Sequence, residues 1–509
     1  MLASTSSATV LGADGLAVTV EAHVGAGLPG FTVVGLPDAS CREVRDRARA
    51  ATLCSGLVWP NRRTTVNLAP SATRKVGSSL DLAVAVAVLA ASGQVPATEV
   101  ASRSFIGELG LDGTVRAVPG VLAMVAAVPM GTVVVPTPSA PEAVLAGDHE
   151  VLGVGDLRQV VDALRSRRPW PLATVPAAEA PSSPSGAGAP DLADVAGHAL
   201  GRRALEVAAA GEHHLLLVGP PGGGKTMLAE RLVGLLPPLD DATALEATRI
   251  HSAAGEPLPD SVLLRRPPLR APHHSATDVA LIGGGSNQLR PGEASLAHGG
   301  VLFLDELGEF SATVLDALRT PLEEGQVRVA RSQLRVTVPA RVLLVGAMNP
   351  CPCGGGGGPG ECRCLPSALA RYGRRLSGPL LDRFDLRVTV AAPDPAVVLA
   401  PACGEPTAVV AARVAAARAL ATARAGVPNG RLGAAQLEAI VPLESPARKA
   451  LERSASRAVL TARGLRRVRC VARTVADLEG WEGPVQDRHV LEAVALRGTP
   501  PGRHLVPPS

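Results

Sequence analysis

A stretch of twelve residues limits the folds open to this chain: LLLVGPPGGGKT, residues 215–226. Its leading apolar residues are typical of a buried strand, and the MLAERLVGLL that follows is typical of a helix. Between them lies the pattern G-x-x-x-x-G-K-[ST], a loop whose backbone N–H groups and lysine bind phosphates while its hydroxyl binds Mg²⁺. A chance glycine turn is the alternative, but the flanking strand and helix favour the phosphate loop. The sequence therefore predicts an α/β core that binds a nucleoside triphosphate through Gly219, Pro220, Pro221, Gly222, Gly223, Gly224, Lys225 and Thr226.

A second apolar strand, residues 301–304 in GGVLFLDELGEF, ends in an acidic pair. We expect Asp305 to hold Mg²⁺ together with Thr226, and Glu306 to polarise the water that attacks the phosphate. Taken alone, such a pair is as often a strand cap, but its position downstream of a phosphate-binding lysine favours catalysis. The next apolar strand, in ARVLLVGAMNP, ends at Asn349, whose neutral side chain suits the orientation of that water. The sequence thus predicts hydrolysis, not binding alone.

Arginines follow these motifs in two places. SGPLLDRFDL puts Arg383 in a charged turn, and TARGLRRVRCVARTVADL puts Arg463 on a helix with several other arginines. A lone arginine is usually solvated, but the order of these residues after the two phosphate motifs favours a role at the nucleotide. Lysine, in contrast, occurs only at Lys75, Lys225 and Lys449. This scarcity suggests that Lys225 stands where arginine would not serve.

The domain organisation follows from length and from one shift in composition. A chain of 509 residues usually needs more than one hydrophobic core. PLATVPAAEAPSSPSGAGAP is almost uncharged and rich in Pro, Ala, Ser and Gly, as flexible linkers are. Strand-like and helical stretches precede it, and Ala/Arg-rich helical periodicity begins near residue 402. We predict an α+β or α/β domain over residues 1–168, a linker over 169–190, the nucleotide-binding core over 191–400 and a helical domain over 401–509.

Composition restricts the partners and the compartment. A formal charge of +4 does not by itself indicate a nucleic-acid binder, and 2% aromatic residues argue against base stacking. The first residues lack a charged segment followed by a long apolar one. The longest uncharged stretch, residues 117–141, is broken by Pro129 and Gly131, so we interpret it as a buried helix followed by a strand. We expect a cytoplasmic protein without a membrane-spanning helix.

The segment NPCPCGGGGGPGECRC, residues 349–364, places two Cys-x-Cys pairs around a run of glycine. Four of the eight cysteines lie here, which does not resemble the disulfide framework of a secreted protein. Four thiolates can bind one tetrahedral Zn²⁺, although Cys-x-Cys is tighter than the usual zinc-finger spacing. Zinc is favoured over an unligated loop and over redox chemistry. The predicted ligands are Cys351, Cys353, Cys362 and Cys364.

With these motifs in this order, the chain resembles the AAA+ ATPases, and within them the magnesium-chelatase-like YifB/ComM family. The resemblance covers nearly the whole chain and rests on stretches such as GPPGGGKTMLAERL, RPGEASLAHGGVLFLDELGEF, VGAMNPCPCG and LSGPLLDRFDL. It implies ATP and Mg²⁺ as cofactors, Asn349 as sensor 1, Arg383 as an arginine finger offered to a neighbouring subunit, and Arg463 as sensor 2. A finger that acts in trans implies a ring, usually a hexamer. The helical C-terminal domain would be the magnesium-chelatase lid.

The N-terminal region resembles the proteolytic domain of the Lon proteases, an α+β fold like domain 2 of ribosomal protein S5. KVGSSLDLAVA corresponds to the segment with the Lon nucleophile, so Ser79 takes that place, with Asp81 where a small glycine is usual. The catalytic lysine would fall at Leu122 in GTVRAVPGVLAM. Because a serine hydroxyl is a poor nucleophile without an amine base, we expect no peptidase activity.

Two loops are candidates for contact with a threaded or encircled polymer. VRVARSQLRVTV alternates like a hairpin with Arg331, Ser332 and Gln333 at its tip. The other loop contains His273 and His274. A solvent-exposed turn and an ordinary polar loop explain these residues equally well.

The resemblance implies a motor that acts on branched or single-stranded DNA, by branch migration or helicase activity, in recombination or natural transformation. The alternative is a chelatase-type ATPase that remodels a protein partner. The Lon-like domain and the cysteine cluster favour the DNA motor, because the chelatase ATPase subunits lack that N-terminal domain. Leu122 argues against an ATP-dependent protease.

Overall fold

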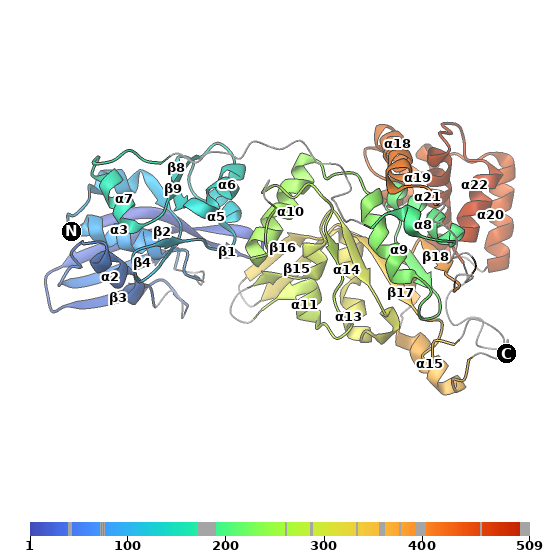
Figure 1. Cartoon of the computed structure of the whole chain (residues 1–509), viewed down its shortest axis with the longest axis horizontal. Helices are drawn as coiled ribbons and strands as arrows, with labels where there is room; N and C mark the ends of the chain where they lie inside the picture. Colours follow the sequence, from blue (N-terminus) through green and yellow to red (C-terminus); the bar gives the residue numbers. More distant parts are fainter. Residues whose placement is uncertain are drawn as a thin grey trace.

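The computed structural model describes residues 1–38, 43–71, 73, 75, 77–171, 190–259, 262–285, 289–331, 334–355, 362–375, 378–392, 396, 404–458 and 461–498. An N-terminal domain, a central α/β domain and a C-terminal helical domain follow one another along the long axis of the molecule (Figure 1). Most of the predicted linker, residues 172–189, lies outside the described residues, as do Ser332 and Gln333 of the predicted hairpin tip.

The N-terminal domain is built on a mixed sheet with the strand order β3-β4-β2-β1-β5-β8-β9. Alternate residues of β2 and β4 are buried, as a period of two in the sequence predicts. Helix α3 (Asp81–Ala91) is buried on all sides, which explains its almost uniformly apolar sequence. The remaining elements are β1 (Leu2–Leu11), β2 (Asp14–Gly25), β3 (Gly30–Val34), α2 (Val44–Cys54), β4 (Arg63–Ala69), α4 (Ala97–Ala101), β5 (Arg103–Phe105), β6 (Glu108–Leu109), β7 (Val115–Arg116), α5 (Val121–Ala127), β8 (Thr132–Pro136), α6 (Ala140–Ala143), β9 (Glu150–Val154) and α7 (Leu157–Leu164).

The residues at the Lon dyad positions are buried in this domain. Ser79 is 5% exposed, and its hydroxyl donates to the carbonyl oxygen of Ala8 at 2.9 Å. Leu122 lies in α5 and is 2% exposed. Asp81 pairs with Arg47 at 2.6 Å, and burial raises the pKa of Asp81 to about 6. The hydroxyl at the predicted nucleophile position is thus committed to a backbone acceptor, and leucine occupies the predicted base position.

The central domain contains a parallel sheet with the strand order β11-β14-β17-β10-β18. Leu215 and Leu217 pack in one hydrophobic core on one face, while Leu216 packs in another with Leu315 and Leu318. Because the strands are covered on both faces, they are apolar throughout, as is usual for parallel sheets. The strands are β10 (Leu215–Val218), β11 (Leu269–Arg270), β14 (Val301–Leu304), β17 (Leu343–Met348) and β18 (Leu386–Thr389).

Helices and short strands surround this sheet. They are α8 (Ala199–Gly211), α9 (Lys225–Leu232), α10 (Asp241–Ala254), α11 (Asp278–Ile282), β12 (Gly283–Gly284), β13 (Arg290–Pro291), α12 (Glu293–Leu296), α13 (Ala312–Ala317), α14 (Arg319–Glu324), β15 (Gln326–Arg331), β16 (Leu334–Pro339), α15 (Pro366–Arg375) and α16 (Gly378–Leu381).

The predicted hairpin consists of β15 and β16, which pair antiparallel. Its buried face packs against the N-terminal domain, since Val336 and Val338 share a hydrophobic core with Ala13 of the β1–β2 turn. The side chains of Arg328 and Arg335 are exposed on the opposite face. The hairpin therefore joins the two domains while it presents arginines to solvent.

The C-terminal domain is helical, as predicted, and is tied to the end of the central sheet. Arg467 of α21 forms an ion pair with the buried Asp385 and donates to the carbonyl oxygen of Arg383 at 2.7 Å. Burial alone would raise the pKa of Asp385, but the charges of Arg467 and His213 hold it below its usual range. The lid thus fixes the turn that carries Arg383. Its helices are α18 (Thr407–Ala425), α19 (Ala434–Ile440), α20 (Ser445–Ala458), α21 (Ala462–Leu478) and α22 (Asp487–Leu496).

In the part of the chain that the structure describes, no helix combines the length and the apolar character needed to cross a membrane.

Candidate nucleotide-binding site

The residues predicted to bind the phosphates and Mg²⁺ and to act on the attacking water converge at one edge of the central sheet. β10, β14 and β17 are parallel neighbours, so their carboxyl ends lie side by side. The glycine loop follows β10, Asp305 and Glu306 follow β14, and Asn349 follows β17. Lys225 and Asn349, 124 positions apart in the chain, therefore meet at the edge where ligands bind to open α/β sheets.

Glycines shape the loop that follows β10. A Cβ atom at Gly219 would lie 2.1 Å from the carbonyl oxygen of Val390, so no side chain fits there. Gly224, at the start of α9, has a φ of 80°, a left-handed conformation that favours glycine. The loop thus leads directly into the positive end of a helix dipole, a site suited to phosphate.

Lys225 is held at the centre of this loop. Its Nζ donates to the carbonyl oxygens of Gly219 at 2.9 Å and Pro220 at 2.8 Å, and to Asn349 Oδ1 at 3.1 Å. The residue is 8% exposed, and burial lowers the pKa of its ammonium group. A buried cation whose partners include neutral oxygens is suited to exchange them for phosphate oxygens, so this site fits ATP.

The two residues expected to hold Mg²⁺ are in direct contact. Thr226 Oγ1 donates to Asp305 Oδ2 at 2.8 Å. A hydroxyl and a carboxylate are hard oxygen ligands, and Mg²⁺ usually takes one or two such protein ligands together with substrate phosphates. The donor set therefore fits a magnesium ion bound with ATP.

Glu306 is held by a residue that the sequence did not assign to this site. His274 Nδ1 lies 3.0 Å from Glu306 Oε2. Glu306 has a φ of 50°, an uncommon value for a residue with a side chain, and it lines a cavity of about 340 Å³. That cavity is lined by Thr226, Glu230, Leu269, Ala271, Pro272, His273, His274, Phe303, Asp305 and Glu306. The loop that contains His273 and His274, for which the sequence left polymer contact and an ordinary polar loop open, therefore lies beside the predicted nucleotide-binding residues.

Arg383 and Arg463 lie together and away from the glycine loop. Both guanidinium groups bind Glu323 Oε1, Arg383 at 2.7 Å and Arg463 at 2.9 Å. Arg383 precedes β18, which runs parallel to β10, so Arg383 is at the amino edge of the sheet and the glycine loop is at the carboxyl edge. The four residues of β10 that separate these edges span about 13 Å.

Comparisons with known proteins agree with this geometry. Residues 191–397 match the family model for magnesium chelatase, subunit ChlI, residues 20–138 match one for subunit ChlI of Mg-chelatase, and residues 404–497 match its C-terminal region. An uncharacterised protein of Mycobacterium tuberculosis is 46% identical over 97% of this chain and 98% of its own. Competence protein ComM of Haemophilus influenzae is 40% identical over 97% of both chains, and YifB of Escherichia coli is 41% identical over 96% of this chain and 95% of its own. The chain belongs to the YifB/ComM family of magnesium-chelatase-like AAA+ proteins.

Membership of the YifB/ComM family supports an AAA+-type ATPase that uses ATP and Mg²⁺. The parallel strand order, the glycine loop and the Asp305–Glu306 pair are the structural features expected of such an ATPase. Lys225, Thr226, Asp305 and Asn349 form one connected group in this structure.

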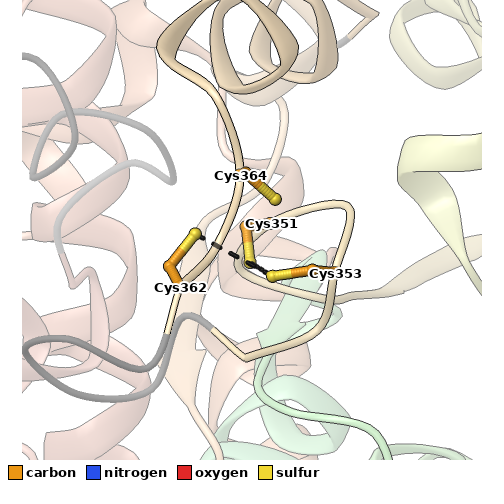
Figure 2. A group of neighbouring side chains, drawn as sticks. All are labelled: Cys351, Cys353, Cys362 and Cys364. Carbon is orange, nitrogen blue, oxygen red and sulfur yellow. Dashed lines mark hydrogen bonds between the residues drawn. The ribbon is translucent and has the colours of Figure 1, made fainter.

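The four cysteines of this YifB/ComM protein also converge. Their Sγ atoms all lie within 4.8 Å of one another, and all four are free thiols (Figure 2). Backbone N–H groups of Arg363 and Gly355 lower the pKa of the Cys353 thiol to about 6. The predicted grouping of the two Cys-x-Cys pairs is therefore present in space.

Sequence reasoning missed two residues at these sites, His274 as the partner of Glu306 and Glu323 as the shared partner of Arg383 and Arg463. His274 stands in a polar loop and Glu323 in α14, and neither position in the sequence indicates a partner.

Proposed function

We propose that this chain is an ATP-hydrolysing ring motor, hexameric and acting on DNA. The proposed ring rests on one observation. Arg383 and Arg463 lie at the opposite edge of the sheet from the glycine loop of their own chain. A guanidinium group at the opposite edge can complete a nucleotide site only in a second copy of the chain. Closed cyclic symmetry is the usual outcome of such head-to-tail contacts.

The residues of the carboxyl edge divide the chemistry of hydrolysis among them. Backbone N–H groups of the glycine loop and the Lys225 ammonium bind the phosphates, and Thr226 and Asp305 hold Mg²⁺, which neutralises phosphate charge when bound. Glu306 accepts the proton of water as the oxygen of that water bonds to the γ-phosphorus. The bond from that phosphorus to the bridging oxygen then breaks and ADP leaves. Asn349, next to Lys225, orients the attacking water.

His274 is expected to position Glu306 for this step. A half-exposed glutamate without a partner samples several rotamers, and only some of them face the attacking water. We expect His274→Ala to lower kcat by about tenfold, at the lower end of what orienting partners contribute. KM for ATP should stay within about twofold, because His274 pairs with Glu306, whereas the phosphate-binding Lys225 is held by Gly219, Pro220 and Asn349. Steady-state ATPase assays measure both constants.

His274→Gln is the matched control for that variant, because its amide can still donate to Glu306. It should recover most of the rate. If both variants hydrolyse ATP like the wild type, or if KM alone changes, His274 does not act through Glu306.

Two observations support DNA as the polymer. A full-length relative is named a competence protein, a term for the uptake of DNA. The β15–β16 hairpin also exposes Arg328 and Arg335 on one face, and arginine contacts to phosphate need no aromatic residues. We propose that this face contacts the phosphate backbone of branched or single-stranded DNA in recombination or natural transformation, by branch migration or helicase activity.

Forked DNA is expected to raise the ATPase rate of the wild-type protein. Counterion release makes such binding salt-dependent, so the stimulation should fall steeply between about 50 and 200 mM salt. The double variant Arg328→Ala/Arg335→Ala should lose most of the stimulation. Arg453→Ala, which removes an exposed arginine from α20 in the C-terminal domain, should keep it. ATPase assays with and without forked and four-way DNA measure each effect.

The matches to magnesium-chelatase models favour one alternative, an ATPase that remodels a protein partner. If no DNA of any shape stimulates hydrolysis, that alternative replaces the DNA motor.

A further inference from the structure

The four-cysteine cluster has the dimensions of a single-metal site. A tetrahedral zinc ion with Zn–S bonds of about 2.3 Å separates its sulfur ligands by about 3.8 Å. Cys351 Sγ and Cys353 Sγ are 3.3 Å apart, Cys353 Sγ and Cys362 Sγ are 3.9 Å apart, and all four sulfur atoms lie within 4.8 Å of one another. In Figure 2 the four side chains point toward a common centre from two segments of the chain.

The sequence around the cluster is rich in glycine. Residues 349–364 include Gly354, Gly355, Gly356, Gly357, Gly358 and Gly360, and glycine loses more backbone entropy on ordering than any other residue. Only Cys351 of the four is buried. Hydrophobic burial therefore contributes little to bringing the sulfur atoms together, whereas a bound metal ion would supply that free energy.

The first Cys-x-Cys pair is in contact with the nucleotide site. Cys351 is two residues after Asn349, whose side chain accepts from Lys225. Gly354 N donates to the carbonyl oxygen of Cys351 at 3.0 Å and closes a turn. Gly354 has a φ of 75°, and a Cβ atom there would lie 2.7 Å from Cγ of Pro221 in the glycine loop. The turn thus packs directly on the loop that binds phosphate.

The second Cys-x-Cys pair leads into α15, which contacts the residues that follow β14 and β17. Tyr372 of α15 donates its hydroxyl to the carbonyl oxygen of Asn349 at 3.1 Å. Arg375 donates to the carbonyl oxygen of Gly308, three residues after Asp305, at 2.7 Å. An ion that joins the two pairs would therefore connect the glycine loop, the Asn349 strand and the segment after Glu306.

We propose that Cys351, Cys353, Cys362 and Cys364 bind one structural Zn²⁺ ion, and that this zinc clip braces the glycine loop and Asn349 in the geometry that binds ATP. Binding forms four Zn–S bonds and releases the thiol protons to solvent. The zinc site rests on the sulfur geometry alone, while its bracing role rests on the proposed ATPase function.

Metal analysis of the full chain, purified without chelator, tests the site. We expect about one zinc and no iron per wild-type chain. The double variant Cys353→Ser/Cys362→Ser, which changes the exposed and half-buried ligands, should retain little or no zinc. Cys54→Ser, which removes an exposed thiol of the N-terminal domain, should retain the wild-type content. Wild-type protein without zinc, protein that holds iron, or undiminished zinc in the double variant would overturn the site.

ATPase kinetics test the brace. The zinc-free variant should have a KM for ATP raised by about tenfold, because the glycine loop is displaced relative to Asn349. If that variant does not fold, zinc removal from the wild type with phenanthroline in excess Mg²⁺, followed by added zinc sulfate, gives the same comparison. Unchanged KM and kcat in folded, zinc-free protein would contradict the role of zinc in holding the glycine loop and Asn349, but not the zinc site itself. A wild type that contains zinc but hydrolyses no ATP would instead contradict the proposed function.

Discussion

Glu306→Gln is expected to bind ATP and to hydrolyse it at least about 10²-fold more slowly than the wild type. Glutamine keeps the shape of the side chain and can still contact His274, but it cannot accept the proton of the attacking water. A loss of that size corresponds to about 3 kcal/mol of transition-state stabilisation. Lys225 is held by Gly219, Pro220 and Asn349, and Thr226 donates to Asp305. Asp305 accepts from Glu306 through the backbone N–H, which glutamine keeps, so nucleotide affinity should be retained. Fluorescent-nucleotide binding and steady-state ATPase assays separate the two effects.

Two further variants complete that experiment. Glu452→Gln changes an exposed glutamate of α20 in the C-terminal domain and should have wild-type activity. Lys225→Ala removes the cation of the glycine loop and should lose tight ATP binding. Wild-type turnover by Glu306→Gln would remove Glu306 from its role as general base.

The sequence predicted those parts of the fold and site that are encoded in short stretches. Strand, glycine loop and helix are consecutive around Lys225, and each apolar strand that ends in a polar residue, at Asp305 or Asn349, has its own local pattern. Parallel neighbours then bring these ends together without further information from side chains. The grouping of Cys351 with Cys364 was also predictable, because only a short stretch of sequence separates the two residues.

Contacts between loops that are far apart in sequence were not predictable in this way. His274 and Glu306 come from the ends of two neighbouring strands, β11 and β14, but a histidine in a polar loop has many possible partners. Glu323 and Arg463 are 140 residues apart and meet because the lid packs against the turn after α16. Packing also places Gly354 on Pro221, a contact that depends on the path of the whole cysteine loop.

Arg383, the proposed arginine finger, is buried in the described structure, whereas the proposed ring requires it to reach a neighbouring subunit. Arg383 is 5% exposed at its side chain, where it pairs with Glu323 and donates to the carbonyl oxygen of Pro379 at 2.6 Å. Burial lowers the pKa of its guanidinium group, although the charge of Glu323 acts in the opposite direction. Reaching a neighbour's ATP requires this side chain to leave Glu323. Arg463 shares the same carboxylate, so the two arginines would be presented to the neighbouring subunit together.

Arg383→Ala is therefore expected to bind ATP normally and to hydrolyse it about 10³-fold more slowly, as arginine-finger losses commonly are. Mixing it with Lys225→Ala should restore part of the activity. In a mixed ring, some interfaces pair the intact glycine loop of the first variant with the intact finger of the second. The control is a mixture of Lys225→Ala with Glu306→Gln. In that mixture every nucleotide site lacks either the lysine or the glutamate. That mixture should stay inactive, because both residues act on the ATP of their own subunit. Equal recovery in the two mixtures, or recovery in neither, would contradict a finger that acts in trans, and the ring would then need another explanation for the position of Arg383.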